Sequence, residues 1–124
     1  SANAAASTML KAANSALEEL DENNKDVKAL DGQNFHSAAL EEASKNDLWK
    51  FMAEYNDDVN STEFAVQIEK GVAICAAARS GSYYGTAPIA YTNKTYPNSG
   101  YSLSNAIDAA KSKYDQNHSV SSAS

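Results

Sequence analysis

The strongest constraint on the fold is the amphipathic periodicity of residues 1–22. Apolar side chains recur there at the i, i+3, i+4 and i+7 positions of a helix, while Lys11, Glu18 and Asp21 fall on the opposite side. A helix over 1–24 is therefore expected, and its apolar side needs another layer of structure to cover it. The side chains expected to hold this helix on a sheet are Met9, Leu10, Leu17 and Leu20.

The alanine-rich start of this helix has no recognisable beginning. Ser1 follows no initiator methionine, and neither a basic leader nor an apolar signal segment precedes it. We therefore expect the sequence to be a product cut inside a longer helix. At the other end of the helix, four carboxylates oppose the helix dipole, which suggests that packing or a partner holds that end. They are Glu18, Glu19, Asp21 and Glu22.

Composition excludes several classes of function. With 124 residues and 43% hydrophobic content, the chain is expected to form one domain. The net charge of −6 argues against nucleic-acid binding, because phosphates are neutralised by clustered Lys and Arg. No apolar run approaches the roughly 20 residues that cross a bilayer, so contact with a membrane is expected only through a segment upstream of Ser1.

Short helices are predicted over 34–57. Residues 31–34 have the composition of a turn, and residues 35–55 have helical spacing. Asn46 with the aspartate after it is a suitable N-cap that would divide the stretch into two helices. The polar residues 56–58 would end the second helix.

The sheet is predicted within residues 62–91. Alanines in this segment favour a helix, but its β-branched residues and its alternating pattern favour strands. Gly71 supplies the positive φ that a two-residue turn requires, so we predict a β-hairpin whose second strand runs on towards Tyr83. The alternating residues on the two strands are Phe64, Val66, Ile68, Val72, Ile74 and Ala76.

The end of the chain is predicted to be helical over 102–115, with a polar, flexible tail over 116–124. Residues 85–101 contain both prolines and have the composition of a loop region. Together with the N-terminal helix and the hairpin, this gives an α+β fold: a long helix on a small antiparallel sheet, short connecting helices and a closing helix. The apolar face of the helix predicted over 102–115 carries Leu103, Ile107, Ala110 and Tyr114.

No arrangement of reactive groups typical of an enzyme is present, and we expect neither catalysis nor a metal or cofactor. Hydrolase, P-loop and dinucleotide motifs are missing. His36 and His118 are far apart and are expected to be solvated. Asp58 opens a calcium-loop pattern, but Glu63 stands where the loop needs glycine. Cys75 lies in an apolar segment and is expected to be buried, unreactive and without a disulfide.

Tyrosines concentrate near the C-terminal end of the predicted sheet. Five of the seven fall within residues 83–101, among Asn, Ser, Thr and Gly. Tyrosine beside small polar residues suits a recognition surface, because the ring supplies contact area and the hydroxyl remains hydrated. The simpler interpretation is that the rings cover a small sheet. The candidate recognition residues are Tyr83, Tyr84, Tyr91, Tyr96 and Tyr101.

Three blocks of sequence resemble type IV pilin-like proteins of Gram-positive bacteria. SANAAASTMLKAANSALEELDE at 1–22 is similar to the second half of their spine helix. AAARSGSYYGTAP at 76–88 is similar to their alanine-rich strand and the following turn, and YSLSNAIDAAKSKY at 101–114 is similar to their closing helix. The family's prepilin peptidase site and apolar half-helix are missing here, and its common C-terminal disulfide cannot form because Cys75 has no partner.

The resemblance implies the globular domain of a type IV pilin or pseudopilin. Such a protein is a non-catalytic subunit of a cell-surface filament, anchored in the membrane before assembly, and it polymerises with other pilin subunits to support adhesion, motility or secretion. Small side chains would let helices of neighbouring subunits approach closely, although alanine is also simply the best helix former. The candidate interface residues are Ala2, Ala4, Ala5, Ala6, Ala12, Ala13 and Ala16.

Two other interpretations remain open. The chain could be a secreted or surface module whose loop over 83–101 binds a polysaccharide or a partner protein. Alternatively, it could be an all-helical bundle that binds lipids or proteins, in which case residues 62–79 would be helical.

Overall fold

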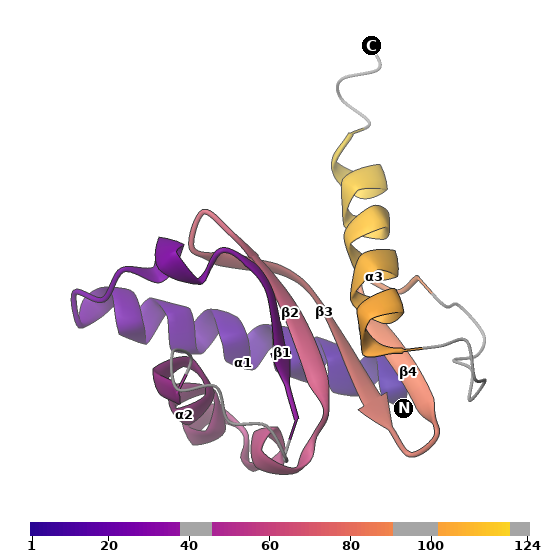
Figure 1. Ribbon diagram of the computed structural model, residues 1–124, viewed down its shortest axis with the longest axis horizontal. Coiled ribbons are helices and arrows are strands. Elements are labelled where there is room, and N and C mark those ends of the chain that lie inside the picture. Colours follow the sequence, from indigo (N-terminus) through magenta and orange to yellow (C-terminus); the bar gives the residue numbers. More distant parts are fainter. Residues whose placement is uncertain (38–45, 91–101, 120–124) are drawn as a thin grey trace.

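The computed structural model describes residues 1–37, 46–90 and 102–119 and has the predicted α+β architecture. A four-stranded antiparallel sheet, in the order β1-β2-β3-β4, has a long N-terminal helix on one face and a C-terminal helix on the other (Figure 1). In chain order, the described elements are α1 (Ala2–Glu22), the 3-10 helix η1 (Val27–Leu30), β1 (Gly32–His36), α2 (Asn46–Tyr55), the 3-10 helix η3 (Asp57–Ser61), β2 (Phe64–Glu69), β3 (Val72–Ser80), β4 (Tyr83–Ala87) and α3 (Leu103–His118).

Helix α1 lies along β3 and runs in the opposite direction. At its start, Ala2 meets Gly85 of β4, which is paired with Ala78 of β3. Twelve residues further along, Asn14 is hydrogen-bonded to Ala73 of β3. The helix rises about 18 Å from Ala2 to Asn14, and β3 extends about 17 Å from Ala78 to Ala73. The helix therefore runs antiparallel to β3 and lies over β4 at its start.

Small residues form this helix-to-sheet contact. Gly85 has no space for a side chain, because a Cβ atom there would collide with the backbone of Ala2 and Asn3. Larger side chains of the helix pack in the same core, where Met9, Leu17 and Leu20 are buried as predicted. The small residues buried in the same core are Ala6, Ala12, Ala13 and Ala16 of α1 and Ala73, Ala76, Ala78 and Ala87 of the sheet.

A second, smaller core lies under α3 on the other face of the sheet. Leu103, Ala106, Ile107 and Ala110 of this helix pack there. β3 is covered on both faces, and its side chains from Ala73 to Ala78 are apolar on both, which is typical of a central strand. On β2 the α3 face is apolar only at Ala65, and Gln67 and Glu69 follow it on that face. The strand residues in this core are Ala65, Cys75 and Ala77.

The predicted β-hairpin is confirmed, and the all-helical alternative is therefore wrong. Lys70 and Gly71 form the turn with φ values of 55° and 78°. The carboxylate of Asp31 accepts hydrogen bonds from both of their N–H groups, at 3.0 and 2.9 Å. This carboxylate fixes the turn to the segment between η1 and β1.

The predicted alternation along β3 is wrong because the strand contains a β-bulge. Ile68 is paired with Ala73 and Gln67 with Cys75, so Ile74 has no partner on β2. The extra residue changes which side chains face each helix. Ala73 and Ala76 face α1, Ile74 joins the α3 core and Val72 is 52% exposed.

The predicted turn at 31–34 and the helix start after it are also wrong. Gly32–His36 forms β1, an edge strand in which Asn34 lies opposite Val66 of β2. Backbone pairing with a distant strand outweighs the local turn propensity of these polar residues. Helix α2 begins at Asn46, as predicted, and the first of the two expected helices falls on residues 38–45, outside the described residues.

The boundaries of the sheet and the last helix differ slightly from expectation. The sheet ends at Ala87, and a turn at Gly81 and Ser82 separates β3 from β4. Helix α3 extends to His118, so residues 116–118 of the predicted tail are helical. Ser102 caps this helix, since its Oγ accepts a hydrogen bond from the N–H of Asn105 at 3.1 Å.

The contact at Gly85 yields a stability prediction. Gly85→Ala should lower the free energy of unfolding by about 3 kcal/mol, because an added methyl group must displace the α1 backbone. Gly81→Ala is the control: no atom lies near its Cβ position, and only its φ of 61° is unfavourable, at a cost of about 1 kcal/mol. Urea unfolding followed by circular dichroism measures both. Equal losses would contradict close packing at Gly85.

Candidate subunit-contact surface

Most of the alanines predicted to contact other subunits are buried in the domain itself. Ala6, Ala13 and Ala16 are fully buried, and Ala2 and Ala12 are 6% and 5% exposed. All five lie on the buried side of α1, which packs within the domain itself. Ala4 is exposed and Ala5 is half-buried, so these two are the members of the set that a second subunit could touch.

The outward side of α1 is formed by small and polar residues. Leu10, expected to hold the helix on the sheet, is only half-buried but does pack against the core. Near the end of the helix, the hydroxyl of Tyr55 donates a hydrogen bond to Glu19 at 2.8 Å, so α2 supports one of the four carboxylates. This carboxylate also raises the pKa of Tyr55. The exposed residues of the helix are Ala4, Lys11, Glu18, Asp21 and Glu22.

A groove of about 500 Å³ opens where the end of α1 passes the β2–β3 turn. Glu18 and Asp21 line it from α1, while Lys28 and Lys70 line it from η1 and the turn. Neither hydrogen bonds nor ion pairs engage these four charged groups within the described part of the chain. The apolar lining residues are Leu17, Val27 and Val72.

The β3–β4 turn, at the opposite end of β3, carries the chain's only arginine. The Nε of Arg79 donates to the carbonyl of Gly81 at 2.9 Å, and its Nη1 lies 3.8 Å from Glu63. Tyr83 is 47% exposed, whereas Tyr84 packs in the core under α3. The other candidate recognition residues, Tyr91, Tyr96 and Tyr101, lie outside the described residues.

The two histidines have different surroundings. His36, expected in solvent, is buried in β1, where it stacks on Phe64 with ring centroids 4.7 Å apart and meets the edge of Trp49. Its Nδ1 donates to the carbonyl of Thr62 at 2.9 Å. Because β1 pairs His36 directly with Phe64, the imidazole becomes part of the core. His118 is exposed as expected.

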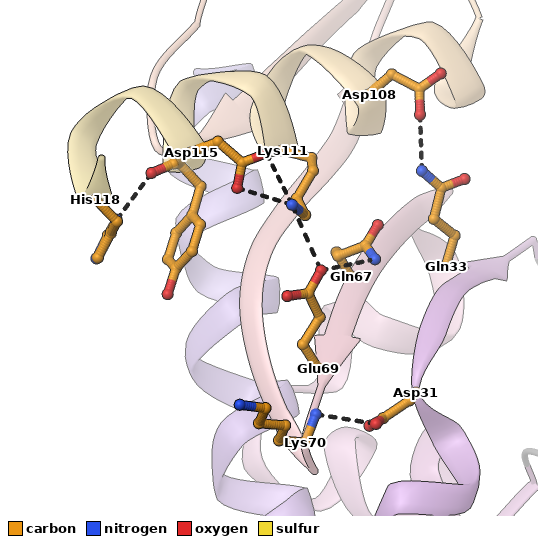
Figure 2. A network of polar contacts seen from close by, with 10 residues as sticks. Asp31, Gln33, Gln67, Glu69, Lys70, Asp108, Lys111, Asp115 and His118 are labelled. Atoms are coloured by element: carbon orange, nitrogen blue, oxygen red, sulfur yellow. Dashed lines mark hydrogen bonds and ion pairs between the residues drawn. The ribbon is translucent and has the colours of Figure 1, made fainter. Parts of the chain in front are cut away.

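A polar network holds α3 against the sheet (Figure 2). The Nζ of Lys111 lies 2.7 Å from Asp115 and 3.5 Å from Glu69 of β2. On the same side, Gln33 of β1 donates to Asp108 at 2.7 Å. The hydrogen bond from Lys111 to Asp115 raises the pKa of the lysine. These contacts orient α3 and are too exposed to add much stability.

Metal-binding potential and thiol reactivity follow from the geometry of residues 1–37, 46–90 and 102–119. Among the described residues, no cluster of three or more His, Cys, Asp or Glu side chains is placed to hold a metal ion. Cys75 is fully buried, as predicted, and burial raises the pKa of its thiol to about 12. A thiol with this pKa is a poor nucleophile near neutral pH.

Comparison of the chain with protein-family models, with curated proteins and with solved structures found no match. None of the helices in the described ranges is long and apolar enough to cross a membrane. The geometry of α1, of the groove and of the β3–β4 turn therefore provides the basis for a functional proposal.

Burial of Cys75 predicts slow thiol chemistry in the native protein. A pKa moved from 9.0 to about 12 lowers the thiolate population about a thousandfold. Ellman's reagent at pH 8 should therefore modify the native chain far more slowly than the chain in urea. A Ser112→Cys variant provides an exposed thiol as the control, and equal rates for both native thiols would contradict the burial of Cys75.

Proposed function

We propose that this domain is the globular part of a filament subunit similar to a type IV pilin or pseudopilin. The observation that supports the proposal best is the position of α1. It lies along one face of the sheet, with its outward side open and its N-terminal end at the edge of the domain beside β4 (Figure 1). A helical segment upstream of Ser1 would extend α1 along its own axis, away from the sheet.

Two further features support this proposal. The order of a long helix, an antiparallel meander and a closing helix is the one that the sequence resemblance implies. The exposed part of the helix is also suited to contact: Ala4 allows a neighbouring helix to approach, and Lys11 can pair with a carboxylate of another subunit. In such a filament the domain would stand at the cell surface and bind other subunits.

A second candidate function is that of a surface module that binds a polysaccharide. It is favoured by the β3–β4 turn, where Tyr83 is 47% exposed and where Arg79 and Gly81 line a polar cavity of about 310 Å³. An aromatic ring beside hydrogen-bonding groups suits a sugar. A polysaccharide that binds the wild-type chain and the Tyr83→Ala variant equally well would contradict this role for the tyrosine. The residues lining the cavity are Ser37, Ser61, Glu63, Arg79 and Gly81.

The filament proposal is tested with the complete gene product, expressed together with a prepilin peptidase and the pilus assembly proteins. Electron microscopy should show filaments that bind antibodies raised against this domain. Ala4→Arg should lower the number of filaments at least about tenfold, since it introduces a large charged group on the open side of α1. Ser112→Arg, on the exposed side of α3, is the matched control. A product that is secreted, folded and unassembled would contradict the proposal.

A further inference from the structure

The two ends of β3 carry surfaces of opposite shape. At the start of the strand, the groove described above is a hollow with an acidic side, a basic side and an apolar lining. At its end, the β3–β4 turn projects with Arg79 and Tyr83 exposed. We propose that the β3–β4 turn of one copy inserts into the groove of a second copy, so that the copies join head to tail.

The groove lacks an occupant within the described part of the chain. Its carboxylates and ammonium groups come from different elements, and none is neutralised by an ion pair there. Val72 is 52% exposed, although it is a large apolar residue in the lining. Unpaired charges beside exposed apolar surface are typical of a contact surface.

The β3–β4 turn has a different side chain on each face. Tyr84 packs in the core under α3, so its neighbour Tyr83 points to the opposite face of the sheet. Arg79 is paired with Tyr84 in the strand register and therefore lies on the α3 face. Gly81 and Ser82 form a narrow tip between them. The turn is thus a thin wedge with a cation on one side and an aromatic ring on the other.

The chemistry of the wedge matches that of the groove. The guanidinium of Arg79 is half-exposed: its Nε is hydrogen-bonded to the Gly81 carbonyl, and its Nη1 makes only a long contact to Glu63. Its remaining N–H groups can pair with Glu18 and Asp21 of the next copy. On the other side of the groove, lysine ammonium groups and apolar side chains can cover the ring of Tyr83. The residues that would contact the ring are Lys28, Lys70 and Val72.

The position of the two surfaces determines the form of the assembly. The two turns are separated by the length of β3, about 26 Å for nine residues. A contact between different surfaces of identical chains is heterologous and repeats without closing unless the rotation forms a ring. Because the groove and the wedge lie at the two ends of β3, each added copy would extend the assembly along the direction of β3. The contact deepens the proposed filament function, on which its biological role rests.

Disulfide trapping tests the contact directly. Ser82→Cys places a thiol on the wedge and Lys28→Cys places one on the groove, while Cys75 stays buried. Under mild oxidation at high protein concentration, an equal mixture of the two variants should form mixed disulfides at least tenfold faster than either variant forms its own. A Ser112→Cys variant mixed with Ser82→Cys measures random collision. Rapid disulfide formation by one variant alone, or a mixture no faster than this control, would overturn the proposal.

Charge reversal provides an independent measurement by sedimentation. The average mass of the wild-type chain should rise with concentration beyond that of a dimer and fall at high salt. Glu18→Lys and Arg79→Glu should each weaken association about tenfold, and the chain that carries both should recover to within about threefold. Glu22→Lys and Lys50→Glu reverse the charge of exposed side chains outside the groove and should have little effect. A mass that stops at the dimer, or a double variant weaker than either single one, would overturn the proposal.

The test of the head-to-tail contact and the test of the filament proposal can give different results. If the thiol pair forms mixed disulfides but the complete gene product makes no filaments, the head-to-tail contact stands and the filament proposal fails. If filaments form while the pair behaves like the control, the head-to-tail contact alone is refuted.

Discussion

Close packing between α1 and the sheet is the interaction on which the rest of the structure depends. It requires Gly85, whose missing side chain leaves room for the backbone of Ala2. It also requires Asn14, because β4 is paired with β3 only as far as Ala76, so the Ala73 peptide groups beyond that point have no partner on β4. The Asn14 side chain donates to the Ala73 carbonyl and accepts from its N–H, both at 3.0 Å. One helix therefore covers the sheet and completes its hydrogen bonding.

The same packing places the two surfaces that matter for assembly. Since α1 runs against the direction of β3, the helix ends beside the β2–β3 turn, where Asp31 holds the turn residues. The groove forms between these elements. At the other end, α1 begins opposite Gly85, so the β3–β4 turn extends past the start of the helix and remains exposed (Figure 1). The groove and the wedge are thus consequences of where the helix is fixed on the sheet.

Local signals in the sequence were sufficient for much of this fold. Helical periodicity predicted α1 and α3, and Gly71 identified the hairpin turn. β1 could not be found in this way, because GQNFH has no clear alternation and owes its conformation to pairing with β2. The bulge at Ile74 likewise depends on the partner strand. Alanine suits both the core of a domain and a contact between subunits. Helical periodicity alone therefore did not show that Ala6 and Ala13 face their own sheet.

The groove was beyond sequence analysis for a related reason. Its charged residues come from three separate segments, represented by Glu18, Lys28 and Lys70, and only the folded chain brings them together. The acidic end of α1 was recognised as an end that packing or a partner should hold. The structure provides part of the packing through Tyr55 and leaves the carboxylates of Glu18 and Asp21 without a hydrogen-bonding partner in the described ranges.

Native-state hydrogen exchange of α1 and β3 tests the central role of the helix most directly. If the helix and the sheet form one cooperative unit, the buried amides of α1 from Met9 to Leu20 and those of β3 from Ala76 to Ala78 should exchange only through global unfolding. Their exchange free energies should then agree to within about 1 kcal/mol and fall in parallel as urea is added. Exchange of the α1 amides at a free energy several kcal/mol lower, with β3 still protected, would show that the sheet is stable without the helix and would contradict this account.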